Sequence, residues 1–151
     1  MIISPDSHLY VGSDYIWTTE RAAEAWALAD RELQEACTSG GYKKVVLLVG
    51  VPGSGKSTWL SRHEDPKVVY FDACFSSRFL RQTYLERIRG WGLDPEIIWV
   101  RTNLQVCLLR NSRRPPNRKV PLEVIHRMWE RLEFSPPAPD ECTVKIVGGG
   151  K

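Results

Sequence analysis

The sequence lacks the features that mark membrane-spanning or exported proteins. No apolar run approaches the roughly 20 residues that a transmembrane helix needs. The first ten residues, MIISPDSHLY, contain neither a basic segment nor a long apolar stretch, so we expect no secretory signal and no membrane partner. The four cysteines lie far apart and form no Cys-x-x-Cys pair, which favours reduced thiols in a cytoplasmic protein.

Repeats and linkers are also absent, so the chain is most simply one domain spanning residues 1–151. Its net charge of +3 is unevenly distributed, because residues 101–131 contain eight Lys/Arg and only two Glu. Prolines interrupt the stretch RNSRRPPNRK, which therefore cannot be one helix. Arginine matches the geometry of phosphate oxygens, so we expect residues 110–120 to form a lid over a phosphate. The alternative is an ordinary solvated charged surface.

Apolar runs alternate with amphipathic segments, which predicts an α/β fold with a mostly parallel five-stranded sheet. Strands are expected at residues 1–4, 43–49, 67–72, 96–101 and 142–147. Helices are expected at residues 19–37, from about residue 56, and at 76–90, 103–111 and 121–132, with a loop over 5–18. Within the helix at 76–90, the inward-facing residues should be Phe79, Leu80, Tyr84 and Ile88.

A glycine-rich stretch between a strand and a helix matches the pattern G-x-x-x-x-G-K-S/T, which binds nucleotide phosphates. Its glycines let the backbone wrap so that N–H groups point at a phosphate, and the helix N-terminus adds the positive end of its dipole. Lys56 is predicted to reach the β- and γ-phosphates of ATP, and Ser57 to hold Mg²⁺. The predicted nucleotide site comprises Gly50, Val51, Pro52, Gly53, Ser54, Gly55, Lys56, Ser57 and Thr58.

A carboxylate is usually needed near the Mg²⁺ of such a site. Asp72 is the candidate, because it ends the strand expected at 67–72, and α/β sheets bind ligands at the carboxyl ends of their strands. The alternative is that Asp72 caps the following helix.

Three stretches together resemble the polynucleotide 5′-kinase branch of the P-loop kinases, typified by the phage end-repair kinase. GVPGSGKSTWL is similar to the family's phosphate loop, VVYFDACFSSRFLR to its second strand and arginine-bearing helix, and LLRNSRRPPNRKVPLEVIHRMWERL to its lid and post-lid helix. The resemblance covers residues 45–132. It implies a three-layer P-loop sandwich and transfer of the γ-phosphate of ATP to a nucleic-acid hydroxyl, most simply a polynucleotide 5′-OH. If the gene is phage-encoded, the expected location is the host cytoplasm.

The same resemblance implies roles for two lid arginines, and it shows that the family's base-bearing strand is missing from its usual place. Arg114 matches the family's essential lid arginine in Arg-Asn-x-x-Arg, and Arg110 is the second candidate. The family's general base is an Asp on the strand directly after the phosphate-loop helix. Here the chain passes from STWLSRHEDP straight into KVVYFDA, so that strand is missing from its usual place.

The beginning of the chain resembles the missing segment. MIISPDSHLY is similar to the family's base-bearing strand end, and YIWTTERAAEAWALADRELQEACTSGG to the helix that follows it. We therefore expect residues 1–42 to be a transposed strand–helix unit, with Asp6 as the base. The implied sheet order, 1–4, 67–72, 43–49, 96–101, 142–147, keeps the crossovers right-handed. The alternative is a decorating extension in which Asp6 is only a turn residue.

The acceptor stays open. Leu9 stands where the family usually has an arginine that holds the acceptor's 3′-phosphate. Other candidate acceptors are a hydroxymethyl pyrimidine base within DNA and a small molecule. For a nucleic-acid acceptor we expect DNA rather than RNA. From a different class, the chain can be a non-catalytic ATP-binding switch or an ATPase, although Asp72 is followed by Ala73 rather than by a glutamate that positions water.

Further candidates for contact with the acceptor lie outside these motifs. Arg78 and Arg81 are expected either to contact acceptor phosphates or to lie on the solvated face of their helix. Tyr15 and Trp17 are candidates for stacking on an acceptor base. His8 would share a side with Asp6 if the segment is extended. The sequence leaves the oligomeric state open.

Overall fold

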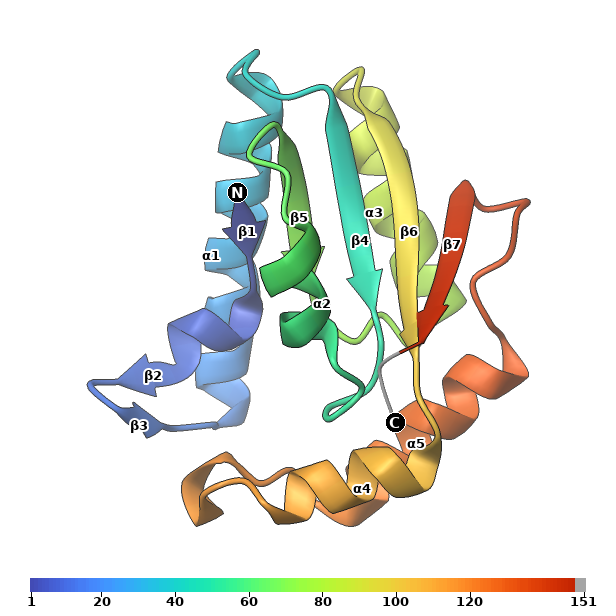
Figure 1. Cartoon of the computed structure of the whole chain (residues 1–151). Helices are drawn as coiled ribbons and strands as arrows, with labels where there is room; N and C mark the ends of the chain where they lie inside the picture. Colours follow the sequence, from blue (N-terminus) through green and yellow to red (C-terminus); the bar gives the residue numbers. More distant parts are fainter. Residues whose placement is uncertain (149–151) are drawn as a thin grey trace.

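The computed structural model describes residues 1–148 and contains a five-stranded parallel sheet with helices on both faces (Figure 1). This confirms the predicted α/β class and the parallel sheet. The strands lie in the order β1-β5-β4-β6-β7. Their bounds are β1 (Ile2–Ile3), β4 (Lys44–Val49), β5 (Val68–Asp72), β6 (Asp94–Arg101) and β7 (Thr143–Gly148). Two further strands, β2 (Tyr10–Val11) and β3 (Asp14–Tyr15), form a separate antiparallel hairpin.

The central strand β4 explains why the sheet is covered on both faces. Its apolar side chains alternate between a larger core, which receives Val45 and Leu47, and a smaller one, which receives Val46 and Leu48. Successive side chains of a strand point to opposite faces, so an uninterrupted apolar run must be buried on both.

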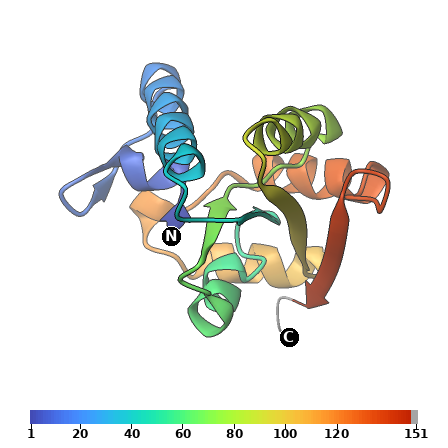
Figure 2. The same cartoon turned by 90° about the horizontal axis from the view of Figure 1, so that it is seen from above.

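Two helices cover one face of the sheet and one short helix covers the other. Figures 1 and 2 show α1 and α3 on the face of the larger core and α2 on the opposite face. The helices are α1 (Thr19–Thr38), α2 (Lys56–His63), α3 (Arg78–Gly90), α4 (Leu104–Ser112) and α5 (Leu122–Phe134), with 3-10 turns η1 (Pro5–Leu9) and η2 (Pro116–Arg118). No helix within residues 1–148 has the length and apolar character needed to cross a membrane.

The carboxyl ends of the five strands point to the same edge of the sheet. At this edge Figure 1 shows the β2-β3 hairpin on one side and α4 with the lid below. The chain segments that leave the sheet here are the ones that follow β1, β4, β5 and β6. This edge is therefore where the predicted site residues come together.

Several local predictions were wrong in detail. Residues 5–18, predicted as a loop, contain η1 and the hairpin. Phe79, predicted to face inward, has 80% of its surface exposed because it lies on the outer side of α3. Pro121 is the N-cap of α5 rather than its first residue, and α4 extends to Ser112, so the expected lid at 110–120 begins with helix.

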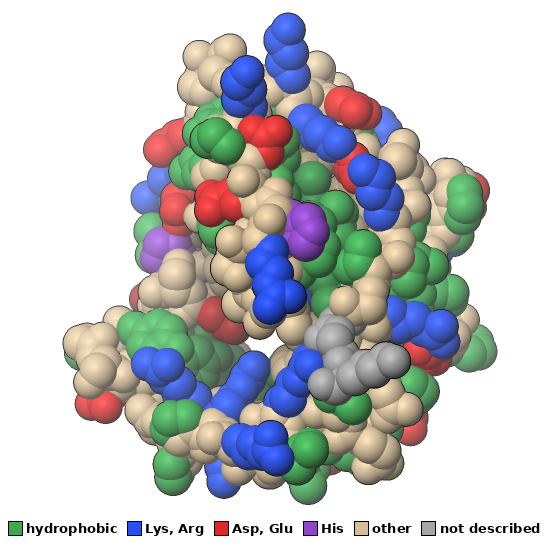
Figure 3. Space-filling view, viewed as in Figure 1, with side chains coloured by type: hydrophobic (Ala, Val, Ile, Leu, Met, Phe, Trp, Pro, Cys, Tyr) green, Lys and Arg blue, Asp and Glu red, His purple; other side chains and the backbone are tan. Residues whose placement is uncertain are grey.

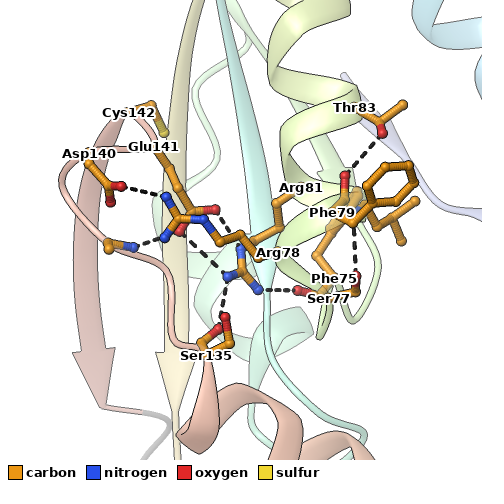
Figure 4. Close-up of polar contacts among 12 residues, drawn as sticks. Phe75, Ser77, Arg78, Phe79, Arg81, Thr83, Ser135, Asp140, Glu141 and Cys142 are labelled. Carbon is orange, nitrogen blue, oxygen red and sulfur yellow. Dashed lines mark hydrogen bonds and ion pairs between the residues drawn. The ribbon is translucent and has the colours of Figure 1, made fainter.

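A buried ion pair fixes the loop between α5 and β7 to α3 (Figure 4). Arg81 is fully buried, and its Nε donates to Glu141 Oε1 over 2.9 Å. Its two terminal nitrogens donate to the carbonyl oxygens of Phe75 and Ser135, each over 2.9 Å. Both predictions for Arg81, an acceptor contact and a solvated face, are therefore wrong. Arg78 instead lies at the surface and pairs with Asp140.

Candidate functional site

The phosphate loop, residues 50–57, joins β4 to α2 and depends on its glycines. Gly53 and Gly55 have φ angles of 83° and 102°, which side chains rarely tolerate. A Cβ added to Gly53 would lie 2.6 Å from the carbonyl oxygen of Cys107. A Cβ added to Gly50 would lie 2.6 Å from Ser54 Oγ. The loop is therefore wound too tightly to accept a larger residue at these positions.

The groups in this loop fit a nucleotide phosphate. Ser54 is buried, and within residues 1–148 its Oγ has no hydrogen-bond partner. Buried hydroxyl groups in proteins nearly always have a hydrogen-bond partner, so this one is available to a bound group such as a phosphate. Lys56 Nζ donates to the Gly50 carbonyl oxygen over 2.6 Å, so the ammonium lies against the start of the loop. Ser57 and Thr58 are exposed in the first turn of α2, where backbone N–H groups lack helical partners.

The loop is tied to the segment that follows β6. Thr102 Oγ1 donates to the Ser54 carbonyl oxygen over 2.7 Å. Arg110, from α4, donates to the Gly53 carbonyl oxygen over 3.0 Å. The structure thus brings Arg110 to residues 50–57, while its role in binding a nucleotide stays a prediction.

Asp72 ends β5 directly beside β4, in register with Leu48. Burial raises the pKa of this carboxyl, the positive charge of Lys56 partly offsets the rise, and the negative charge of Asp6 adds to it. The charges of Lys56 and Asp6 are therefore both felt by the Asp72 carboxyl at this edge. The alternative role for Asp72 as a helix cap is wrong, because Ser77 caps α3 by accepting from the Leu80 N–H.

Asp6 reaches this edge because β1 pairs with β5, with Ile3 beside Phe71. The chain then turns through η1, where Asp6 is exposed in the first turn. Asp6 and Asp72 thus follow neighbouring parallel strands. His8 does not share the direction of Asp6 in an extended segment, because η1 is helical and His8 pairs with Glu32.

Tyr15, on β3, connects Asp6 to the lid. Its hydroxyl donates to Asp6 Oδ1 over 3.3 Å. Burial raises the pKa of Tyr15 to about 12, with a further contribution from Asp6 and a smaller opposing one from Arg114. The phenol therefore stays protonated at neutral pH and keeps its proton for Asp6.

The lid is closed at its base and contacts the hairpin. The Asn111 side chain donates to the Val120 carbonyl oxygen over 2.8 Å and accepts from the Val120 N–H over 3.0 Å. At the far end of the lid, the Arg118 guanidinium lies 5.2 Å from the ring centroid of Tyr10. Figure 3 shows a hollow between the hairpin, the lid and the body of the protein, with Lys and Arg side chains along its lower rim.

Comparison with protein-family models gave no match, and comparison with curated proteins gave none either.

Ser57 and Asp72 are the two residues that the sequence predicts to hold a metal ion. No cluster of three or more His, Cys, Asp or Glu that could bind a metal occurs within residues 1–148. The Ser57 hydroxyl and the Asp72 carboxylate are of the oxygen type that Mg²⁺ prefers, and Mg²⁺ typically takes one or two protein oxygens together with phosphates and water, so their binding of Mg²⁺ stays a prediction.

Sequence analysis missed two residues that support the site and predicted a different role for a third. Thr102 supports the phosphate loop, Asn111 closes the lid, and Tyr15 binds Asp6. Asn111 carried a local signal, since asparagine at a helix end often bonds to nearby backbone. Tyr15 is predicted above as a candidate for stacking on a base. Its hydrogen bond to Asp6 depends on a hairpin whose strands have only two residues each, which is too short a pattern to predict.

Proposed function

We propose that this protein is an ATP-dependent kinase of the P-loop type that transfers the γ-phosphate of ATP to a nucleic-acid hydroxyl, most simply a polynucleotide 5′-OH. One observation carries the proposal. Asp6 follows β1 at the edge where Asp72 ends β5 and the phosphate loop follows β4. Transfer to a hydroxyl uses a carboxylate that accepts the hydroxyl proton beside the phosphate-binding loop.

The arrangement of the front segment supports the transposed unit within this proposal. β1 is the edge strand beside β5, and α1 packs over the same face as α3. A base-bearing strand and its helix would occupy these positions in the usual chain order. The resemblance of the phosphate loop, the Asp72 strand and the lid to polynucleotide 5′-kinases supports the nucleic-acid acceptor.

The phosphates of ATP would bind to residues 50–57. Lys56 would exchange the Gly50 carbonyl oxygen for phosphate oxygens, and Ser54 Oγ would gain the partner that it lacks. Ser57 and Asp72 would hold Mg²⁺, which neutralises phosphate charge when bound. The fixed charges of Lys56 and Arg110 at the loop would keep the γ-phosphate in place.

In the transfer step, Asp6 would accept the proton of the acceptor hydroxyl. The hydroxyl oxygen forms a bond to the γ-phosphorus as the bond to the β,γ-bridging oxygen breaks, and that oxygen leaves with the electron pair on ADP. Arg114 and Arg110, on the lid side, would stabilise the negative charge that spreads over the transferred group. Tyr15 would orient the Asp6 carboxylate through its hydroxyl.

The test is transfer of labelled γ-phosphate to three samples: a 5′-OH oligonucleotide, a hydroxymethylated duplex with blocked ends, and buffer alone. Asp6→Asn should lower transfer to the oligonucleotide by roughly 10²- to 10⁴-fold, the usual contribution of a positioned base. Asp94→Asn is the matched control, since Asp94 is exposed at the amino end of β6 and should leave transfer unchanged.

Each outcome identifies a different function. Label only inside the blocked duplex would make the acceptor a modified base, and ATP turnover in buffer alone at the same rate would make the protein an ATPase. If Asp6→Asn transfers phosphate as fast as wild type, Asp6 is not the base and the front segment is a decoration. Circular dichroism of the variant verifies its folding.

A further inference from the structure

Apolar side chains gather on the β2-β3 hairpin although the hairpin has little core to bury them in. Of the eleven large hydrophobic residues that are exposed within residues 1–148, four fall between residues 10 and 17. We call these four the hairpin platform: Tyr10, Val11, Ile16 and Trp17. Trp17 has the largest exposed fraction of the four, 60%. Apolar groups concentrated in this way mark a binding surface more often than scattered ones do.

The hairpin holds this surface in a defined position. Gly12 takes a φ of 62° in the two-residue turn between β2 and β3, which suits a tight hairpin. So short a hairpin is marginal alone. It is anchored where the Ile16 N–H donates to the Leu9 carbonyl oxygen over 2.9 Å and where Arg21 Nε donates to the Ile16 carbonyl oxygen over 3.0 Å. These contacts fix the residue beside Trp17.

Cations of the lid adjoin the platform. The lid segment after α4 contains Arg113, Arg114, Arg118 and Lys119. Arg118 lies over the Tyr10 ring, and η2 contacts β3. Figure 3 shows hydrophobic side chains beside the hollow with basic side chains next to them. The lid and the platform thus meet where the Arg118 guanidinium lies over the Tyr10 ring.

We propose that the hairpin platform and the lid cations bind an unpaired nucleic-acid strand adjoining the hydroxyl that is phosphorylated. This inference rests on the proposed kinase function. A strand offers a base that can stack on Trp17 and phosphates that can pair with lid cations. Bases inside a duplex are stacked on each other and cannot reach an exposed ring, so the surface selects unpaired strands. Tyr10 and Tyr15 are in edge contact, with ring centroids 5.4 Å apart, and Tyr15 binds Asp6, so the platform adjoins the reacting carboxylate.

The first experiment measures binding without catalysis. The anisotropy of a fluorescent 12-residue oligothymidylate reports binding to the full chain without ATP. Trp17→Ala should weaken binding about 5- to 100-fold, the effect of losing one stacked base. Phe134→Ala is the matched control, because Phe134 is 93% exposed at the end of α5 and should leave binding unchanged. Arg118→Gln should weaken binding and lower the dependence of log affinity on log salt by about 0.7, the value for one single-strand phosphate.

The inference is overturned if Trp17→Ala and Phe134→Ala bind the oligonucleotide equally well, or if a blunt duplex binds wild type as tightly as the single strand. It is also overturned if Trp17→Ala instead abolishes self-association in sedimentation or binding to anionic vesicles, since the platform would then serve a protein or a lipid surface.

Kinetics separate this inference from the proposed function. Trp17→Ala should raise KM more for the 12-residue acceptor than for a nucleoside 3′-phosphate, which has no second base to stack. If strand binding depends on Trp17 but no phosphate is transferred, the binding role of the hairpin platform stands and the proposed kinase activity is refuted. If phosphate is transferred and the ratio of KM for the nucleoside 3′-phosphate to KM for the 12-residue acceptor is the same in Trp17→Ala and wild type, the kinase activity stands and the binding role of the hairpin platform is refuted.

Discussion

Replacing Arg81 by Met should destabilise the protein severely. Its guanidinium is fully buried and donates to Glu141, Phe75 and Ser135. Met fills much of the same space but leaves the Glu141 carboxylate buried without its counter-charge, with only the Ala138 N–H, 2.8 Å away, still donating to it. Breaking one side of a buried ion pair typically costs roughly 3–5 kcal/mol. That is a large part of the roughly 5–15 kcal/mol that stabilises an average domain.

Urea unfolding followed by tryptophan fluorescence measures this loss. For a chain of this size each kcal/mol lowers the melting temperature by roughly 2–4 °C, so Arg81→Met should melt roughly 6–20 °C below wild type. Glu141→Gln should also destabilise, and the double variant should lose less than the sum of the two, because the pair is coupled. Arg78→Met is the matched control, since its ion pair with Asp140 is exposed and should matter little. An Arg81→Met protein as stable as Arg78→Met would refute this reasoning.

Three further predictions follow from the titrating groups. Burial raises the pKa of Asp72 and so disfavours its charged form; Asp72→Asn should therefore raise the free energy of unfolding at pH 7–8 in metal-free buffer. That gain should shrink as the pH falls and vanish below the ordinary aspartate pKa of about 4. Urea unfolding measures the gain at neutral pH and below the ordinary aspartate pKa, and equal gains under the two conditions would contradict the prediction. Tyr15→Phe should lower kcat about 2- to 10-fold, the effect of one hydrogen bond to Asp6. Because the pKa of Tyr15 is about 12, the loss should be constant from pH 7 to 9, and a loss confined to one end of that range would argue against this role. Burial raises the pKa of all four cysteine thiols, so alkylation at pH 8, followed by mass spectrometry, should be slow in the native protein and fast in urea; one thiol that reacts like free cysteine would contradict the raised pKa of that thiol.

Local patterns predicted the elements of the fold because each element carried its own signal. The apolar run of β4 predicts burial on both faces, and the helices α1 and α4 begin where Thr18 and Asn103 accept hydrogen bonds from the backbone of their first turns. The same patterns failed where a partner lies far away in the chain. Arg81 is buried because Glu141 meets it from 60 residues further on, and no local period can reveal such a pair.

The candidate site divides in the same way. The tight winding of residues 50–57 was predictable from the spacing of their glycines, since contacts within the loop and with α4 leave no room for a Cβ at Gly50 and Gly53. The prediction for Phe79 failed for another reason: it lies about two and a half turns before the buried Ile88, so helical spacing itself places the two on opposite sides of α3. Asp6 and Asp72 lie at one edge only because two strands far apart in sequence pair.

The pairing of β1 with β5 sets an order of events during synthesis. Ile3 lies beside Phe71, and β1, at the end of the sheet, has β5 as its single neighbour there. At a typical translation rate of roughly 5–20 residues per second, the first strand waits roughly 4–14 seconds for its partner to be made. During that interval β1 has no β5 strand to pair with, so Asp6 is not yet positioned next to Asp72. Asp6 is translated well before Asp72, so a nascent chain released before β5 is complete cannot bring the two carboxylates to this edge.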